Sequence, residues 1–451
     1  MSTTLDLQPF LSAVSAAEPV RVHGKVTEVI GLLIVSSGPT ASVGDVCTLE
    51  KDGQIVGRAE VVGFRKNGTL LMPLGSTGGI HPGLTVVTTK RPLAVAIGPH
   101  VLGRVLDGLG NPIDGKGPLR SEENRPVFAN PPNPLTRRRI SEQFVTGVRA
   151  IDSFVSIGKG QRMGIFSGSG VGKSVLLGMM ARNCNAEVNV IGLIGERGRE
   201  VREFLEKNLG DEGLKRSVVV VATSEQPALI RLKAAMVAAS LAEYFRDQGK
   251  DVLLMLDSVT RLAMAQREVG LAIGEPPATK GYTPSVFAML PQLLERAGNS
   301  DKGSVTGIFA VLVDADDMDE PIADAVRGII DGHIVLSRKL AHRNHFPAID
   351  VLESISRCMP DVVTGDHLGM AGRLKDYMAA YRENEDIIQI GAYANGSSER
   401  VDKAIRLHPP LTVFLRQGMV EKCSFAESLD KARQLLSAVD SPAPRVAPVR
   451  K

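Results

Sequence analysis

One short stretch constrains the fold of this chain more than any other. Residues 167–174 have the sequence Ser-Gly-Ser-Gly-Val-Gly-Lys-Ser, which matches the phosphate-binding pattern G-x-x-x-x-G-K-[ST] except for serine at its first position. The glycines let successive backbone N–H groups face one anion, Lys173 adds a positive charge, and the Ser174 hydroxyl can bind Mg²⁺. Apolar residues 163–166 predict a strand before the loop, and residues 175–182 predict a helix after it. We expect a nucleotide-phosphate site here rather than a Gly/Ser-rich surface turn.

The region around this loop alternates between apolar runs and helical patterns. Strands are predicted at Val188–Ile194, Val218–Val221, Val252–Leu256, Ile308–Val313 and Ile334–Leu336, and helices at Glu200–Leu209, Ala228–Phe245 and Ser285–Arg296. This alternation predicts a parallel sheet with right-handed crossovers and helices on both faces. In such a sheet the ligand binds beyond the carboxyl ends of the strands, where the phosphate loop also lies.

The flanking regions differ from this core. Between residues 20 and 89, short β-branched runs alternate with turn residues, which predicts a small closed β-barrel. After residue 365 the pattern becomes helical, with helices predicted at Leu368–Arg382, Val401–Leu407, Leu411–Leu415 and Phe425–Val439. The predicted division is an N-terminal amphipathic segment 1–18, a barrel 19–92, a nucleotide-binding core 93–365, a helical domain 366–440 and a disordered proline-rich tail 441–451. For residues 1–18, a short helix and a frayed terminus are equal alternatives.

Charge and aromatic content argue against a nucleic-acid partner. The chain has 53 basic and 50 acidic residues and a net charge of +3, which is too balanced to indicate a nucleic-acid surface. A barrel that stacks the bases of a single strand needs aromatic side chains, and Phe64 is the only aromatic residue between residues 20 and 90. The basic run Arg137–Arg139 is interpreted as solvated surface rather than as a binding patch.

Other features of the composition indicate the compartment. The four cysteines are far apart in the sequence, which disfavours a disulfide framework or a metal site and favours a reducing cytosol. The N-terminus lacks a signal-peptide pattern, and no apolar run approaches the ~20 residues of a membrane helix. We therefore expect a cytoplasmic protein that reaches a membrane only through its partners.

Two acidic residues follow predicted strands and could take part in chemistry. Asp257 ends the run Val252–Leu256, where a carboxylate can help to hold Mg²⁺ directly or through water. Its alternative role is an N-cap, which we would favour if no phosphate loop lay upstream. Glu196 follows the run Val188–Ile194, and beside a γ-phosphate it could polarise water for in-line attack. From chemistry alone, a charge-dense helix start explains Glu196 equally well.

A later segment makes the chain resemble a known family. Residues 346–357 have the sequence Phe-Pro-Ala-Ile-Asp-Val-Leu-Glu-Ser-Ile-Ser-Arg, which is similar to the signature of the rotary ATP synthase catalytic and non-catalytic subunits. Together with residues 168–174 and Gly-Glu-Arg-Gly-Arg-Glu-Val at 195–201, it most resembles the flagellar protein-export ATPases, with the injectisome (type III secretion) ATPases as close relatives. The resemblance covers nearly the whole chain. It implies an α/β fold, with a P-loop (RecA-like) parallel-sheet ATPase core between an N-terminal small β-barrel and a C-terminal helical domain.

The resemblance also implies roles for individual residues. The residues implied to bind ATP are Gly168, Ser169, Gly170, Val171, Gly172, Lys173, Ser174, Val175 and Phe346, the last by packing on adenine. Those implied at Mg²⁺ are Ser174, Asp257 and, through a metal-bound water, Glu200. Those implied in catalysis are Lys173, the glutamate Glu196, Arg197 and Arg261 near the γ-phosphate, and Arg357 as an arginine finger for the neighbouring subunit. Phe346 could instead be a core residue, and Phe425 aligns too loosely for a role.

The implied function is ATP hydrolysis that energises type III protein export across the inner membrane for flagellar assembly. The resemblance implies a homohexameric ring with active sites at subunit interfaces, cytoplasmic and peripheral at the inner-membrane export apparatus. The implied partners are a dimeric regulatory subunit, a central stalk-like component, export-gate membrane proteins, and export substrates with their chaperones. No nucleic acid is expected among them.

Three other functions compete with this one. No residue separates an injectisome secretion ATPase from the flagellar protein. A non-catalytic nucleotide-binding subunit of a rotary ATPase typically lacks a glutamate at the position of Glu196, so its presence argues against that class. A ring helicase on single-stranded RNA would need a barrel with aromatic residues and a basic groove, which the sequence does not show.

Overall fold

The computed structural model describes residues 7–8, 22–66, 68–313 and 317–440. The chain divides into two compact units, Met1–Leu93 and Ala94–Lys451. The predicted N-terminal segment, apart from Leu7 and Gln8, and the predicted tail 441–451 lie outside the described residues. Within the described ranges, no helix is both long enough and apolar enough to cross a membrane.

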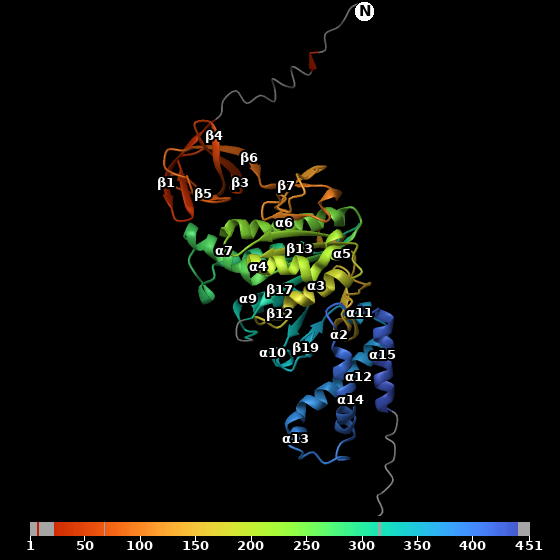
Figure 1. Cartoon of the computed structure of the whole chain (residues 1–451). Helices are drawn as coiled ribbons and strands as arrows, with labels where there is room; N and C mark the ends of the chain where they lie inside the picture. The colour runs from red at the N-terminus through yellow and green to blue at the C-terminus, as the bar shows by residue number, and fades with distance from the viewer. Residues whose placement is uncertain (1–6, 9–21, 67, 314–316, 441–451) are drawn as a thin grey trace, which may run out of the picture. The chain divides into compact units, whose positions relative to one another are not determined.

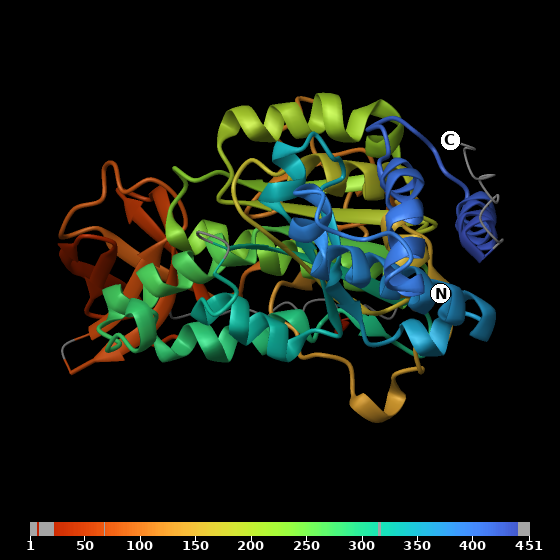
Figure 2. The same ribbon diagram turned by 90° about the horizontal axis from the view of Figure 1, so that it is seen from below.

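The first unit contains the predicted barrel, whose strands are red to orange in Figure 2. The barrel is closed in the strand order β1-β2-β5-β4-β3-β6. Its strands are β1 (Gly24–Ile30), β2 (Leu33–Ser36), β3 (Asp45–Lys51), β4 (Gln54–Arg65), β5 (Gly68–Pro73) and β6 (Thr85–Pro92). Their alternating apolar residues fill the interior: Val26, Ile34, Cys47, Leu49, Ala59, Val61, Leu71, Leu84 and Val86. Phe64 lies outside this core, with 54% of its surface exposed.

The second unit is built on a nine-stranded sheet in the order β19-β18-β12-β17-β15-β13-β14-β8, with β16 paired to β17. Its strands are β8 (Val105–Asp107), β12 (Arg162–Ser167), β13 (Val188–Ile194), β14 (Ser217–Ala222), β15 (Asp251–Asp257), β16 (Gly298–Asn299), β17 (Ser304–Leu312), β18 (Gly332–Leu336) and β19 (Ile349–Ser356). The strands from β8 to β18 along this order are parallel, as predicted, whereas β19 runs antiparallel to β18. Two small ladders pair β7 (Ala94–Ile97) with β9 (Glu123–Pro126), and β10 (Gln143–Phe144) with β11 (Ile157–Gly158).

Helices cover both faces of this sheet (Figure 1). They are α2 (Arg149–Phe154), α3 (Lys173–Asn183), α4 (Gly198–Glu203), α5 (Gly210–Lys215), α6 (Ala228–Asp247), α7 (Val259–Ile273), α8 (Pro284–Leu294), α9 (Pro321–Ile329), α10 (Arg338–His342) and α11 (Met359–Val362). Ile165, Leu193 and Met255 point to the face that shares a core with Leu177 and Met180 of α3. Helix α6 runs along β13, β14 and β15. The strands are thus buried on both faces, which explains their nearly continuous apolar sequences.

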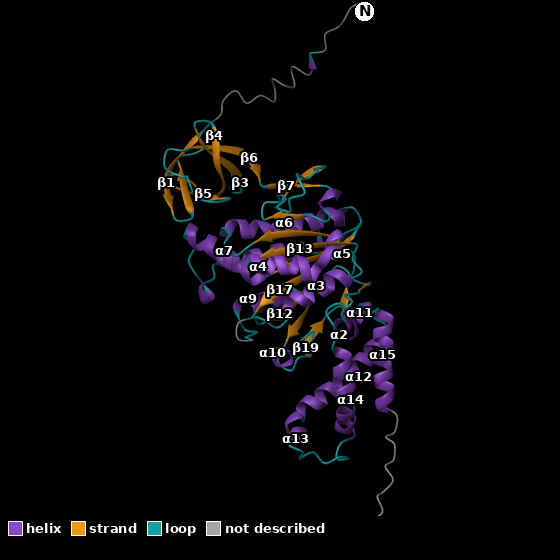
Figure 3. Cartoon of the chain, viewed as in Figure 1, coloured by secondary structure: helices purple, strands orange, loops and turns teal. Residues whose placement is uncertain are grey.

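The C-terminal part of the second unit is helical, as predicted (Figure 3). It consists of α12 (Gly365–Glu383), α13 (Glu385–Gln389), α14 (Glu399–Leu415) and α15 (Phe425–Asp440). The prediction of two helices on either side of Pro409 and Pro410 is wrong, because α14 continues through both prolines. Its buried residues Leu407 and Leu411 keep the helical spacing across them. Packing of this apolar face therefore outweighs the lost backbone hydrogen bonds, a cost of about 3 kcal/mol or more for an interior proline.

A second difference concerns the predicted helix Glu200–Leu209. The structure divides it into α4 and a π-helical turn, Phe204–Leu209, which leads into α5. Phe204 and Leu209 are both buried, and residues five apart lie on one side of a π-turn. The turn also packs closely on α3, where a Cβ at Gly178 would lie 2.6 Å from the carbonyl oxygen of Asn208. Packing against α3 therefore decides this local geometry.

The basic run Arg137–Arg139 is also not simply solvated surface. Arg137 is half-buried and donates hydrogen bonds to the carbonyl oxygens of Glu295 (2.7 Å) and Ala297 (3.2 Å). Arg138 donates to the carbonyl oxygen of Ser300 at 2.9 Å. Guanidinium groups satisfy several carbonyls at once, so this run fastens the connecting segment to the loop before β17.

Candidate active site

The phosphate loop joins strand β12 to helix α3. Gly170 and Gly172 have φ angles of 79° and 92°, a left-handed conformation that glycine adopts without strain. Gly172 is the N-cap of α3, so Lys173 is the first residue of the helix. Ser167, where the sequence departs from the motif, is the buried last residue of β12. The loop has the backbone curl and the helix N-terminus that together bind phosphate.

The ammonium group of Lys173 lies between two carboxylates. Its Nζ atom is bonded to Oδ1 of Asp257 and lies 3.5 Å from Oε1 of Glu196. Lys173, Asp257 and Glu196 have exposed side-chain fractions of 10%, 2% and 15%. Burial by itself would lower the pKa of Lys173, but the two carboxylates raise it above its usual value. The lysine therefore stays charged at the phosphate loop.

The register of the sheet explains why the two acids meet. Asp257 ends β15 and pairs with Leu193 of the adjacent β13, three residues before Glu196. Both strands thus present an acid at the same edge. The hydroxyl of Ser258 accepts the N–H of Arg261 at 3.3 Å and caps α7. The alternative role of Asp257 as an N-cap is therefore wrong, and its carboxylate faces the loop lysine instead.

Glu196 has an unusual acidity for a glutamate. Burial is the main cause that raises the pKa of Glu196 to about 7; Lys173 opposes the rise, and Asp257 and a hydrogen bond with Glu200 add to it. The same hydrogen bond is the main cause that lowers the pKa of Glu200. Glu196 therefore holds a proton more strongly than Glu200 does. A carboxylate that titrates near neutral pH is suited to accept a proton from water.

Two arginines lie near this pair of glutamates. The backbone N–H of Arg197 donates to Oε2 of Glu200 at 3.3 Å, while its guanidinium is 73% exposed and 3.8 Å from Oε1. Arg261 packs against Gly195, where a Cβ would lie 2.8 Å from the Cβ of Arg261. Its buried Nε atom has no hydrogen-bond partner among the described residues. A buried donor without a partner, on a side chain that packs against Gly195, fits a site that binds an anion.

The residues present therefore fit a nucleotide phosphate with Mg²⁺. The hydroxyl of Ser174, in the first turn of α3, and the carboxylates of Asp257 and Glu200 are the oxygen donors that Mg²⁺ prefers. Lys173 and the loop N–H groups are the donors that phosphate requires. Val175 follows Ser174 in the helix and is half-buried.

Phe346 lies beside the phosphate loop of its own chain. A Cβ at Gly172 would lie 3.5 Å from Cδ1 of the Phe346 ring, and 41% of the Phe346 surface is exposed. An exposed ring next to the loop can stack on a nucleobase. Phe425, for which the sequence supported no role, packs on His367 with ring centroids 5.8 Å apart.

Arg357 lies at the opposite edge of the same sheet, where the parallel strands begin. Strand β19 ends at Ser356, which pairs with Gly332 at the start of β18. Arg357 follows, exposed, and its backbone N–H donates to the carbonyl oxygen of Asp331 at 2.9 Å. Strand β12 extends from this edge to the phosphate loop, about 17 Å at the usual rise per residue. The structure therefore brings together the other candidate residues but not Arg357.

Sequence analysis missed residues that support the site from a distance. Gln417 and Arg149 connect the C-terminal helices to the core, and Gln161 supports the turn at Arg357. All three are buried polar side chains. A buried glutamine or arginine has no distinctive spacing in a sequence, so no motif could have identified them.

Comparison with known families agrees with this geometry. The model of the ATP synthase alpha/beta family nucleotide-binding domain matches residues 147–356. The beta-barrel domain of that family matches residues 26–90, and the T3SS EscN ATPase C-terminal domain matches residues 363–434. These matches confirm the predicted fold class.

Individual relatives are similar over nearly their whole length. The flagellum-specific ATP synthase of Bacillus subtilis is 53% identical over 430 residues, which cover 94% of this chain and 97% of the relative. The type 3 secretion system ATPase of Xanthomonas euvesicatoria is 49% identical over 431 residues, 95% of this chain and 96% of the relative. A solved structure of the assembled ATPase EscN from enteropathogenic E. coli, in complex with its central stalk EscO, matches with a TM-score of 0.86 at 44% identity, covering 92% of this chain and 100% of the EscN chain. Through its phosphate loop, its paired acids and this similarity, the chain belongs to the family of flagellum-specific ATP synthases and type 3 secretion system ATPases.

Proposed function

We propose that this chain is a Mg²⁺-dependent ATP hydrolase that energises type III protein export for flagellar assembly. The observation that carries the proposal is the buried Lys173 between Asp257 and Glu196 beside a phosphate loop. Bound Mg²⁺ would offset the phosphate charge, held by Ser174 and Asp257 and through water by Glu200. The loop N–H groups and Lys173 orient the phosphates, and Phe346 packs on adenine.

Glu196 then acts as the base for the attacking water. Its pKa of about 7 lets it lose a proton near neutral pH and accept one from water as water attacks the γ-phosphate. Glu200 positions Glu196 through their hydrogen bond. Arg197 lies 3.8 Å from Glu200, and Arg261 packs on Gly195, the residue before Glu196; both would counter charge on the γ-phosphate. The presence of this base argues against a non-catalytic nucleotide-binding subunit.

The active unit is proposed to be a homohexameric ring with sites at the subunit interfaces. Arg357 is exposed and lies about 17 Å from the loop of its own chain, at the usual rise of a strand. In a ring it would serve the γ-phosphate of the next subunit as an arginine finger. The assembled state of the similar EscN protein supports this arrangement.

The direct test measures ATP hydrolysis by the purified chain across protein concentrations, with Mg²⁺ or with EDTA. We expect Mg²⁺-dependent turnover that rises as rings form, with the rings followed by light scattering. Adding single-stranded RNA should leave the rate unchanged. Turnover that does not change as rings form would contradict shared sites, and stimulation by RNA would favour a helicase.

Further partners follow from the family. The stalk EscO bound to the EscN assembly supports a central stalk-like partner for this chain. A dimeric regulatory subunit, export-gate membrane proteins, and export substrates with their chaperones are also proposed, which would place the cytoplasmic ring at the inner membrane. Residues 1–18 are the proposed contact for the regulatory subunit. Deleting them should leave a folded ATPase but weaken hexamer formation or pull-down of the regulatory subunit. Unchanged assembly together with unchanged binding would refute that contact.

The injectisome remains the second candidate. The 49% identity to the Xanthomonas secretion ATPase supports it, and the 53% identity to the Bacillus flagellar protein favours the flagellar role. Deleting the gene decides between them. Loss of flagellar filaments with secretion of other proteins intact supports the flagellar role, and the reverse pattern supports the injectisome.

A further inference from the structure

The loop between α14 and α15, residues 416–423, contacts several parts of the nucleotide core. We call it the clasp loop. The backbone N–H of Gln417 donates to the carbonyl oxygen of Phe346 at 2.9 Å. Arg182, near the end of the helix that follows the phosphate loop, donates to the carbonyl oxygen of Met419 at 2.5 Å. The clasp loop therefore connects the C-terminal helices to the Phe346 segment and to the helix that follows the phosphate loop.

The side chain of Gln417 fixes the clasp loop to the core. It is 4% exposed, and its Oε1 atom accepts the backbone N–H of Arg149 at 2.8 Å. Its Nε2 atom donates to the carbonyl oxygens of Gly147 (2.9 Å) and Glu421 (3.1 Å). All three bonds are buried or partly buried, so losing the amide would leave main-chain groups without partners.

Arg149 holds the same loop from the core side. Its guanidinium donates to the carbonyl oxygens of Phe414 (2.7 Å) and Arg416 (3.1 Å) and pairs with the carboxylate of Glu421. It also lies over the Phe414 ring, 5.5 Å from its centroid. The clasp loop is thus held at both ends, and Gln417 lies between them.

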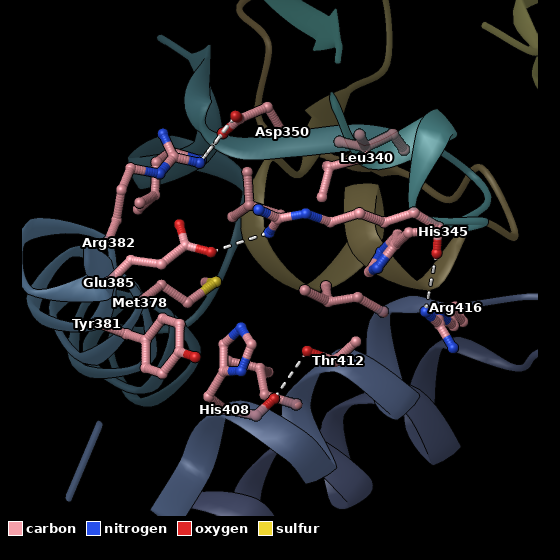
Figure 4. A pocket seen from close by; sticks show the side chains of 16 residues that line it. Leu340, His345, Asp350, Met378, Tyr381, Arg382, Glu385, His408, Thr412 and Arg416 are labelled. Atoms are coloured by element: carbon pink, nitrogen blue, oxygen red, sulfur yellow. Dashed lines mark hydrogen bonds and ion pairs between the residues drawn. The ribbon is translucent and has the colours of Figure 1, made fainter. Parts of the chain in front are cut away.

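A cavity borders the segment that carries Phe346. A cavity of about 190 Å³ lies between β19, α10, α12 and α14, and His345 and Arg416 are among its lining residues (Figure 4). Polar and apolar side chains line it, among them the stacked rings of Tyr381 and His408, whose centroids are 3.7 Å apart. His345, the residue before Phe346, borders this space, and the hydrogen bond from the clasp loop to the carbonyl oxygen of Phe346 adds a direct restraint on the segment.

We infer that Gln417 is a positioning residue that holds Phe346 in place to stack on the nucleobase. The inference rests on the proposed stacking of Phe346 on adenine. The side-chain hydrogen bonds of Gln417 fix the clasp loop on the core. The backbone N–H of the same residue donates to the carbonyl oxygen of Phe346, so a fixed clasp loop also fixes the Phe346 backbone. Gln417 should therefore control the part of nucleotide affinity that comes from the base, and leave the part that comes from the phosphates unchanged.

The experiment compares a ligand with a base and a ligand without one. Binding of AMP-PNP with Mg²⁺ and of inorganic tripolyphosphate with Mg²⁺ is measured by calorimetry on wild-type and Gln417→Ala chains. Stacking on an aromatic residue is worth roughly 5- to 100-fold in affinity. Because Gln417→Ala would weaken the stacking only in part, we expect it to reduce AMP-PNP affinity about three- to tenfold and to leave tripolyphosphate affinity unchanged. Equal loss for both ligands, or no loss for either, overturns the inference.

Gln161→Ala is the matched control. Gln161 is also a fully buried glutamine with several hydrogen bonds, but it lies at the opposite edge of the sheet. It should leave the affinities for both ligands unchanged. A loss of AMP-PNP affinity in this control equal to that in Gln417→Ala would mean that general loosening of the fold explains the effect, and would overturn the inference.

Phe346→Ala separates this inference from the proposed function. It should lose AMP-PNP affinity and keep tripolyphosphate affinity. If it keeps both, the proposed stacking fails. If Phe346→Ala loses the base contribution while Gln417→Ala does not, only the positioning role fails.

A measurement on the wild-type chain tests the inference without relying on the variants to fold. The amide hydrogen of Gln417, which bonds to Phe346, should exchange more slowly with AMP-PNP bound than with tripolyphosphate bound. Equal protection by the two ligands contradicts the role of Gln417.

Discussion

The two edges of the core sheet present different kinds of residues. At the carboxyl edge, the largely buried Lys173 lies between Asp257 and Glu196, so these three charged groups are partners within one chain. At the opposite edge, Arg357 is exposed on a turn that buried hydrogen bonds hold in place. One of these bonds comes from the fully buried Gln161, which donates to the hydroxyl of Ser356 at 3.0 Å.

This difference indicates which edge binds a ligand of its own chain and which can reach a ligand of another chain. Buried charges stabilised by each other form a site within one chain. An exposed guanidinium on a well-held turn is available to a ligand outside its own chain. One sheet therefore carries both halves of the proposed site, but on edges that only a neighbouring copy can bring together. The following predictions test this division.

The largest effect is expected from the pair Arg357→Ala and Lys173→Ala. Each variant should lose hydrolysis, because an arginine finger alone is worth about 10³–10⁵-fold in rate. A mixture of the two should recover part of the activity, since some interfaces pair an intact loop with an intact finger. The measurement is ATP turnover of the mixture across ratios. If co-assembled mixtures show no recovery at any ratio, Arg357 does not act across the interface.

Glu196→Gln should give the next largest effect. The amide keeps the shape of the side chain but cannot accept the proton, so turnover should fall about 10²–10⁴-fold. Nucleotide affinity should stay near that of the wild type, because Lys173 and the loop remain. Single-turnover kinetics and calorimetry measure the two quantities. Turnover near the wild-type rate would assign Glu196 a structural role only.

Gln161→Ala tests the opposite edge. Losing its hydrogen bonds should let the turn at Arg357 shift, and a misplacement of about 1 Å can cost up to roughly 10²-fold in rate. We expect kcat to fall about tenfold or more within that range, with KM for ATP unchanged. Steady-state kinetics decide the point. A raised KM with normal kcat would show that this edge acts on nucleotide binding instead.

The smallest effect is expected on stability, as the pH falls from 7 to 5. Burial, Arg416 and His408 lower the pKa of His345 to about 4. His345 is therefore neutral in the folded chain at neutral pH. Its contribution to the free energy of unfolding is fully present above the pKa of histidine in the unfolded chain, and it is lost as the pH falls toward 4. Between pH 7 and 5 the free energy of unfolding should fall by up to about 2 kcal/mol. Denaturant unfolding of wild type and His345→Gln measures this, and equal pH dependence would contradict it.

Local patterns made much of the site predictable. The phosphate loop could be predicted because its glycines, Lys173 and Ser174 are adjacent in the chain and each has a specific task. Asp257 and Glu196 could be predicted because each lies at the carboxyl end of an apolar run, and parallel strands end at one edge. Their contacts with Lys173 also needed the register of β13 and β15, which apolar runs do not specify.

The sequence by itself determined the class of fold, the phosphate loop and the family, because these depend on local spacing and on apolar periodicity. Only the tertiary structure decided which residues meet across long separations. It paired Glu196 with Glu200 in a buried setting that raises the pKa of Glu196, and it placed Arg357 on the far edge because β19 reverses direction. It also joined Gln417 to Phe346, 71 residues apart, through a hydrogen bond that no local pattern encodes.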